Sequence, residues 1–168
     1  MNSFDKVIGY KSIKRELLQI CDMIRNRTIY EKMGARLPRG LLLYGDPGLG
    51  KSLLANCFME ECGLNTVTVR RDKGGDAFIN SIAQAFAKAK EEAPSVLLLD
   101  DMDKFANEDS SRCDAPEYVA VQAGIDDVKE TDVFVIATAN EIRKLPDSLC
   151  RSGRFDRKIG VWAPTAAD

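Results

Sequence analysis

The chain has 168 residues, enough for one domain with its own hydrophobic core. Its apolar share of 45%, its charged share of 30% and its net charge of -2 are typical of a globular protein and do not suggest nucleic-acid binding. The sequence holds no histidine, which excludes histidine-dependent triads and HExxH zinc sites within these residues. It has five cysteines without a CxxC pair and no apolar run of membrane-spanning length. We therefore expect a cytoplasmic protein, with any membrane anchor in segments outside this sequence.

In the first half of the chain, helical periodicity alternates with short apolar runs. Apolar residues at helical spacing predict a first helix over roughly 11 to 33. The unbroken run Leu41 to Tyr44 is typical of a strand buried on both faces. A helix from about Lys51 to Cys62 follows, with Gly63 as its C-cap, and the β-branched run Thr66 to Val69 predicts the second strand.

The second half of the chain continues the alternation. We predict an amphipathic helix that carries Phe78 and ends at Pro94, a strand at Val96 to Leu99, a helix over 115 to 128, a strand at Val133 to Thr138, a short helix near Pro146 to Arg151 and a fifth strand from Lys158 to Trp162. The core is expected to hold Phe78, Trp162 and the thiols of Cys57 and Cys62. This order predicts βαβ units around a largely parallel sheet, on which ligands bind beyond the carboxyl ends of the strands.

A GxxxxGKS pattern, Gly45 to Ser52, follows the first predicted strand. Its glycines let the backbone approach a phosphate chain closely, and the next helix points its positive end at that chain. Lys51 can reach the β- and γ-phosphates and Ser52 can bind Mg²⁺. A chance glycine-rich turn is the alternative, and the strand before the loop and the helix after it argue against that. We therefore expect ATP or ADP with Mg²⁺, bound by Asp46, Pro47, Gly48, Leu49, Gly50, Lys51, Ser52 and Leu53.

Polar residues also follow the third and fourth predicted strands. Asp100 is expected to place the magnesium ion and Asp101 to position the attacking water. For Asp101, Asp103, Glu108 and Asp109 a solvated acidic loop is the alternative, and it is favoured for the last three. Asn140 is expected beside the magnesium site, where its amide can bind the γ-phosphate or the water, although asparagine after a strand is also common turn chemistry.

A basic segment, Arg151 to Arg157, precedes the last predicted strand. Its arginines can cap a helix C-terminus, with Gly153 ending that helix. Alternatively they can stabilise transition-state charge in the site of a neighbouring copy. The residues alone do not decide between these two interpretations.

Taken together, these motifs resemble the AAA+ ATPases, and within them the AAA subgroup of membrane-anchored AAA proteases and unfoldases. Val7-Ile8-Gly9 resembles the segment that contacts adenine, Leu97 to Asp101 resembles Walker B, and Asn140 matches the sensor-1 position. Arg151 and Arg154 fall on the arginine-finger positions. The resemblance implies a three-layer αβα P-loop NTPase sandwich with a five-stranded parallel sheet of order 5-1-4-3-2. It also implies assembly of several copies into a ring, usually a hexamer, that acts on a protein substrate.

The sequence departs from this family at three places. Asp101 replaces the usual glutamate, so its shorter side chain predicts slower hydrolysis. Lys73-Gly74-Gly75-Asp76 lacks the aromatic pore-loop residue, which puts the threading of polypeptide in doubt. The helical lid that follows the fifth strand in the family is absent, so residues 1–168 are expected to be one α/β subdomain of a longer protein, with weak turnover in isolation.

Two functions from different classes fit these residues. The first is an ATPase whose energy drives conformational work on a protein partner. The second is a nucleotide-dependent switch or scaffold that binds ATP and hydrolyses it little, which Asp101 and the missing pore aromatic favour. A P-loop kinase or a nucleic-acid motor fits less well, because neither an acceptor pocket nor interleaved basic and aromatic residues can be read from the sequence.

Overall fold

The computed structural model describes residues 2–72, 74–106, 116–151 and 153–165. Their core is a parallel sheet of five strands, β1 (Gly40–Tyr44), β2 (Asn65–Val69), β3 (Ser95–Leu99), β4 (Val133–Ala139) and β5 (Arg157–Gly160). The strand order is β2-β3-β4-β1-β5, which confirms the predicted order 5-1-4-3-2. Several residues of the predicted motifs lie outside the described residues: Lys73, Glu108, Asp109, the cysteine Cys113 and Ser152 of the basic segment.

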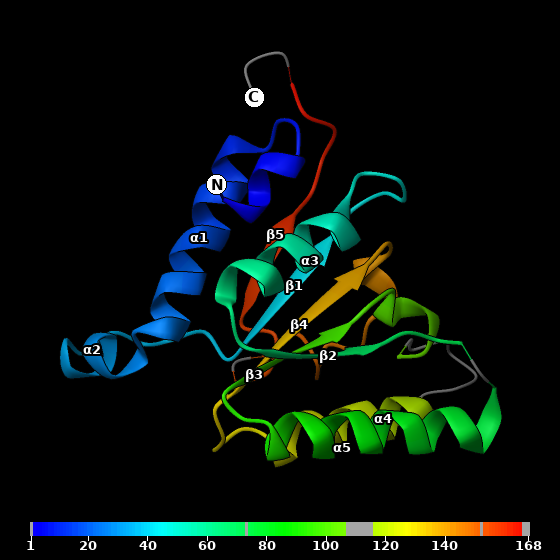
Figure 1. The fold of residues 1–168 in the computed structure, drawn as a ribbon. Helices are drawn as coiled ribbons and strands as arrows, with labels where there is room; N and C mark the ends of the chain where they lie inside the picture. Colours follow the sequence, from blue (N-terminus) through cyan, green and yellow to red (C-terminus); the bar gives the residue numbers. More distant parts are fainter. Residues whose placement is uncertain (1, 73, 107–115, 152, 166–168) are drawn as a thin grey trace.

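Helices cover both faces of the sheet and complete the predicted three layers (Figure 1). One face carries the short 3-10 helix η1 (Ser3–Lys6), α1 (Lys11–Arg25) and α3 (Lys51–Cys62), and the other carries α4 (Gly75–Glu91) and α5 (Pro116–Asp127). Successive residues of a strand point to opposite faces. Leu41 and Leu43 accordingly join the core under α1 and α3, whereas Leu42 joins the core under α4 and α5.

The first helix is shorter than predicted. It breaks at Asn26 into α1 and α2 (Arg27–Lys32), and Asn26 takes backbone angles of φ -107° and ψ 29°. Asparagine is a weak helix former because its side chain hydrogen-bonds locally, and here its amide donates to Asp22 Oδ1 at 2.8 Å. The expectation of one continuous helix over 11 to 33 was therefore wrong.

The region around the last strand also differs from the prediction. The expected helix near Pro146 to Arg151 is a pair of turns, in which the Leu149 and Cys150 amides donate three residues back, to Pro146 and Asp147. Strand β5 ends at Gly160, so Trp162 lies beyond it and is 61% exposed rather than buried in the core. Its ring packs edge-on against Tyr44, with centroids 6.1 Å apart.

The parallel arrangement brings the carboxyl ends of β1, β3 and β4 to one edge of the sheet, because these strands are neighbours. The residues that follow them are Gly45, Asp100 and Asn140. Phe78, Cys57 and Cys62 are buried as predicted. Within the described part of the chain, no helix combines the length and the apolar character needed to cross a bilayer.

Candidate active site at the carboxyl edge of the sheet

The GxxxxGKS loop joins β1 to α3, as the sequence predicts. Gly50 is the N-cap of α3 and has φ 81°, a left-handed conformation that favours glycine. At the other end of the loop, a Cβ on Gly45 would come 2.1 Å from the Val161 carbonyl oxygen, so only glycine fits between β1 and the end of β5. Asp46, Pro47 and Gly48 are exposed between these fixed ends. The loop therefore offers its backbone to solvent at the N-terminus of α3, a position that favours anions such as phosphate.

Lys51, the first residue of α3, is buried in this loop. Its Nζ donates to the carbonyl oxygens of Gly45 at 2.7 Å and of Asp46 at 2.6 Å. Burial lowers the pKa of Lys51 below its ordinary value, and the nearby carboxylates of Asp101 and Asp103 oppose that shift by favouring the charged form. The ammonium group is thus held at the mouth of the loop, within reach of a phosphate bound there.

Asp100 is the centre of a hydrogen-bond network at the end of β3. Its buried carboxylate accepts the Ser52 hydroxyl at 2.8 Å and the Thr138 hydroxyl at 2.7 Å, both on Oδ1. The guanidinium of Arg70 binds the other oxygen, Oδ2. Burial alone would raise the pKa of Asp100, but the bonds from Thr138, Ser52 and Arg70 outweigh it and hold that pKa below its usual range. Asp100 is therefore an ionised carboxylate beside the P-loop.

The donor set of Ser52 and Asp100 fits Mg²⁺. Magnesium prefers oxygen ligands and is usually bound through one or two carboxylates together with substrate phosphates and waters, not by an all-protein cage. The described residues contain no cluster of three or more histidine, cysteine, aspartate or glutamate side chains placed to hold a metal. A hydroxyl and a carboxylate that already share a hydrogen bond beside the phosphate loop match that sparse mode of binding.

Asp101 has a strained backbone. It is a non-glycine residue with φ 52° and ψ 49°, a left-handed conformation that costs about 1 kcal/mol and is found at turns as well as at functional sites. Its amide donates to the Thr138 hydroxyl at 2.8 Å, and its Oδ2 accepts Lys104 Nζ at 2.7 Å. The side chain therefore stands at the same edge as Asp100, as predicted, with one carboxylate oxygen engaged by Lys104.

Asn140 follows β4, between the P-loop strand and the Asp100 strand. The backbone N–H groups of Asn140 and Glu141 both donate to Asp103 Oδ2 at 3.2 Å. Asp103 is therefore buried and structural, and the expectation that it belongs to a solvated acidic loop was wrong. The reason is the 3-10 helix η2 (Met102–Lys104), which turns Asp103 inward under the end of β4.

The expected adenine segment lies next to the P-loop. Ile8 is 89% exposed, and Gly9 has φ 76° in the turn that leads into α1. The following residue, Tyr10, donates its hydroxyl to the Leu49 carbonyl at 2.9 Å. This bond holds the Ile8 turn against the P-loop, and so places an exposed apolar side chain on the segment that the resemblance assigns to adenine. Leu53 is exposed on the first turn of α3.

Arg151 and Arg154 lie at the opposite edge of the sheet, before β5 begins. A Cβ on Gly40, the first residue of β1, would come 2.6 Å from the Arg154 carbonyl oxygen, whereas Lys51 follows the other end of β1. The Arg154 side chain is 15% exposed and binds Asp126 at 2.8 and 3.1 Å, while Arg151 is exposed. The structure does not bring these arginines to the P-loop of their own chain.

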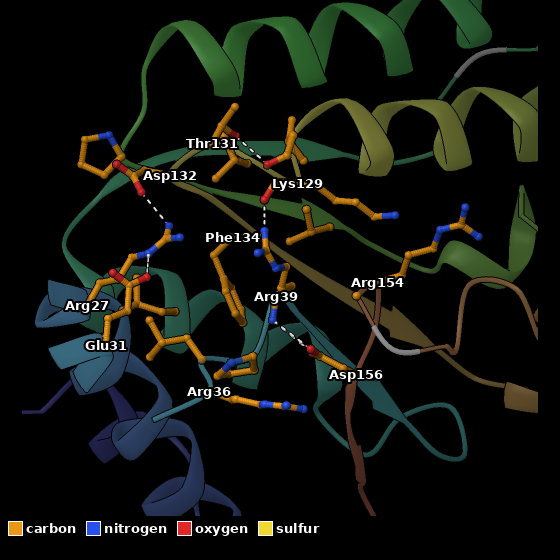
Figure 2. Close-up of a pocket in the computed structure, with 18 of the residues that line it drawn as sticks. Arg27, Glu31, Arg36, Arg39, Lys129, Thr131, Asp132, Phe134, Arg154 and Asp156 are labelled. Atoms are coloured by element: carbon orange, nitrogen blue, oxygen red, sulfur yellow. Dashed lines mark hydrogen bonds and ion pairs between the residues drawn. The ribbon is translucent and has the colours of Figure 1, made fainter. Parts of the chain in front are cut away.

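A pocket of about 830 Å³ also lies at this amino edge (Figure 2). Arg27 lines it and bonds Asp132 at 2.6 Å and Glu31 at 2.8 Å, and the Arg39 amide donates to Asp156 at 3.1 Å. Figure 2 shows the ends of the basic side chains spread around the apolar ring of Phe134. Because the pocket includes none of the P-loop residues, it is separate from the site built by Lys51 and Asp100.

Four residues that the sequence did not mark position the predicted site residues: Tyr10, Arg70 and Thr138 at the P-loop edge, and Asp126 beside Arg154 at the opposite edge. Thr138 carries a signal that could have revealed it, since it is a buried hydroxyl within the otherwise apolar strand β4. The other three act through partners that are between 28 and 39 positions away along the chain. No local pattern marks such pairs.

Comparison with known proteins relates the chain to one family. The family model described as "ATPase family associated with various cellular activities (AAA)" matches residues 41–162. The ATP-dependent zinc metalloprotease FtsH of Mycoplasma pneumoniae is 34% identical over 173 residues, which cover 96% of this chain and 24% of that protein. FtsH of Leptotrichia buccalis is 35% identical, covering 96% of the chain and 22% of the relative. The chain thus spans about a quarter of the length of the curated relatives it matches.

Proposed function

Because the chain belongs to the AAA family of ATPases, we propose that it binds ATP with Mg²⁺ at the loop Gly45–Ser52 and uses ATP hydrolysis to drive conformational change in a protein partner. The observation that carries this proposal is the convergence of Lys51, Ser52 and Asp100 at the carboxyl edge of the sheet. Their types and their order along the chain are those that phosphoryl transfer requires.

Each of these side chains has a distinct role in the proposal. Lys51 neutralises charge on the β- and γ-phosphates, and Ser52 and Asp100 hold the magnesium ion. Bound Mg²⁺ supplies charge neutralisation at the phosphate oxygens. Asp101 orients the attacking water and accepts its proton, and the Asn140 amide holds that water or the γ-phosphate.

We further propose that each site is completed by a neighbouring copy in a ring, which the resemblance makes a hexamer. The position of Arg151 and Arg154 at the amino edge supports this, since the strand β1 separates them from their own P-loop. The ion pair with Asp126 holds Arg154 in a defined orientation at that edge. An arginine supplied by a neighbour stabilises the charge of the transition state.

The partner is proposed to be a protein substrate. The relatives named above are ATP-dependent zinc metalloproteases, and the absence of histidine from this chain leaves it without histidine ligands for zinc. The chain would then supply ATP-driven work and not peptide-bond hydrolysis. A cytoplasmic location is part of the same proposal, and the free thiols of Cys21, Cys57, Cys62 and Cys150 suit a reducing compartment.

A switch that hydrolyses little ATP is the second candidate. It is favoured by Asp101, which stands in the usual glutamate position and has one oxygen bound to Lys104. Phosphate release separates the two functions, measured for the wild type, Asp101→Ala and Asp101→Glu over a range of protein concentrations. Asp127→Ala removes an exposed carboxylate at the end of α5 and is the matched control.

The ATPase proposal expects the wild type to exceed Asp101→Ala by about 100-fold or more, since a positioned base contributes about 10²- to 10⁴-fold to such reactions. It also expects Asp101→Glu to turn over faster than the wild type, because the longer side chain reaches further. Turnover per chain should rise with protein concentration if neighbours complete the site. Equal rates for the wild type and Asp101→Ala would support the switch instead.

A further inference from the structure

Arg70 binds the carboxylate that is expected to hold magnesium, although it belongs to neither the P-loop nor the arginine pair at the amino edge. We propose that the Arg70 guanidinium competes with Mg²⁺ for Asp100 Oδ2, and thereby sets the magnesium concentration at which the site loads nucleotide. This inference rests on the proposed function, because it requires Mg²⁺ at Asp100. It adds a positioning residue that regulates loading of the metal.

The backbone of β2 determines where Arg70 lies. The Asp100 amide donates to the Val69 carbonyl at 2.9 Å, which extends the pairing of β2 and β3 beyond their last strand residues. Arg70 therefore starts directly beside Asp100. Its Nε lies 3.0 Å from Asp100 Oδ2, and a second guanidinium nitrogen binds the same oxygen.

The two oxygens of Asp100 serve different partners. The hydroxyls of Ser52 and Thr138 bind Oδ1, so Oδ2 is the oxygen that faces Arg70. A guanidinium and a divalent cation that contact one carboxylate oxygen repel each other, because charges of +1 and +2 about 4 Å apart repel even at the dielectric constant of water. A metal at this oxygen, bound directly or through a water of its hydration shell, is therefore disfavoured while Arg70 occupies Oδ2.

Arg70 is built to be displaced. The Asp100 side chain is 2% exposed and fixed by its neighbours, whereas the Arg70 side chain is 62% exposed. A long side chain that is mostly in water can swing away without disturbing the core. The competition therefore involves movement of one surface side chain, while the carboxylate keeps the geometry that Ser52 and Thr138 impose.

The adjacent Arg71 provides a matched comparison. Its guanidinium donates to the Lys104 carbonyl at 2.8 Å and lies 5.8 Å from the centroid of the Phe78 ring. Arg71 thus anchors the segment after β2 without touching Asp100. Removal of Arg70 should leave this anchor in place, and replacement of Arg71 removes the same charge from the same segment without freeing Asp100.

The test is a magnesium titration of the chain at a fixed concentration of a fluorescent N-methylanthraniloyl ADP, for the wild type, Arg70→Gln, Arg70→Lys and Arg71→Gln. The apparent affinity for the metal is the intrinsic affinity multiplied by the fraction of molecules in which Arg70 does not bind Asp100. If Arg70 binds Asp100 in about 70–90% of molecules, metal binding is therefore weakened about 3- to 10-fold. We expect Arg70→Gln to lower the half-saturating Mg²⁺ concentration by about that factor. Arg71→Gln should match the wild type, and Arg70→Lys should fall between the two.

Several results would overturn the inference. An unchanged half-saturation point in Arg70→Gln, or the same shift in Arg71→Gln, would mean that Arg70 does not compete for Asp100. A higher magnesium requirement, or weaker nucleotide binding in EDTA, would make Arg70 a phosphate ligand instead. Circular dichroism checks that each variant is folded. If Arg70→Gln does not fold, the comparison of Arg70→Lys with the wild type still tests the inference. If the wild type showed no magnesium-dependent nucleotide binding, the proposed function would fail together with this inference.

Discussion

Thr138 links the carboxylate of Asp100 to the backbone of Asp101, and its replacement by valine tests whether that link matters. Its hydroxyl donates to Asp100 Oδ1 at 2.7 Å and accepts the Asp101 amide at 2.8 Å. Valine has nearly the same shape, so Thr138→Val removes both hydrogen bonds without opening a cavity. The side chain is fully buried in β4, and water cannot replace the lost partner.

The expected loss of stability follows from these two bonds. A hydrogen bond to a charged group contributes about 1.5–3 kcal/mol, and an amide left without its partner costs at least about 1 kcal/mol. Thr138→Val should therefore lower the free energy of unfolding by about 3 kcal/mol. For a domain of this size each kcal/mol shifts Tm by about 2–4 °C, so the variant should melt roughly 6–12 °C below the wild type.

The second readout is the binding of nucleotide with and without magnesium. Asp100 loses one of the two hydroxyls that orient Oδ1, so the affinity for Mg-ADP should fall several-fold while the affinity for ADP in EDTA stays the same. Thr131→Val is the control, because the Thr131 hydroxyl donates at 2.7 Å to Val128 at the other edge of the sheet. A Thr138→Val protein that melts within about 2 °C of the wild type, with unchanged Mg-ADP affinity, would refute this account of Thr138.

Two further predictions concern the flanks of the site. Tyr10→Phe removes the hydroxyl that donates to the Leu49 carbonyl, and it should lower the free energy of unfolding by about 1 kcal/mol. The affinity for ADP, measured by calorimetry, should fall a few-fold. An unchanged affinity would contradict the role of Tyr10. Hydrogen bonds from Arg154 and Lys129 lower the pKa of Asp126 from 3.8 to about 2, so their stabilisation is present above the ordinary pKa and is lost as the pH falls from about 4 to about 2. Asp126→Asn should therefore flatten the fall of Tm over that range, and melting curves with the same pH dependence as the wild type would count against the pair.

The strands of this fold could be predicted because their signal is local. Leu41 to Tyr44 and Val96 to Leu99 are contiguous apolar runs, and each lies within the strand that the structure shows. The P-loop is equally local, since its glycines and Lys51 occupy fixed positions between a strand and a helix. These strands and this loop are determined by residues that are adjacent in the sequence, so a local pattern is enough to predict them.

The remainder of the site depends on contacts between distant segments. Arg70 meets Asp100 only because β2 lies beside β3, and Asp126 meets Arg154 only because α5 and the segment before β5 share one edge. Asp103 was misjudged for the same reason, since a charged residue in a loop is usually solvated and only the position of β4 makes it buried. The Asn26 break was missed because a single weak helix former does not interrupt an apolar stripe.

If the arginines of a neighbouring copy complete each site, as proposed, the separation of Arg154 from Lys51 by the length of β1 also restricts the symmetry of the active assembly. Two copies related by a dyad present the same patch to each other, and a patch at one edge of the sheet holds the arginines or the P-loop but not both. Isologous dimers therefore leave every site incomplete. In a heterologous, head-to-tail assembly each copy is related to the next by the same rotation. If such an assembly does not close into a ring, the copy at one end has a P-loop with no neighbour to supply arginines. Under the proposed sharing of sites, only a closed ring would complete all of them, and activity per chain would then report whether the ring has closed.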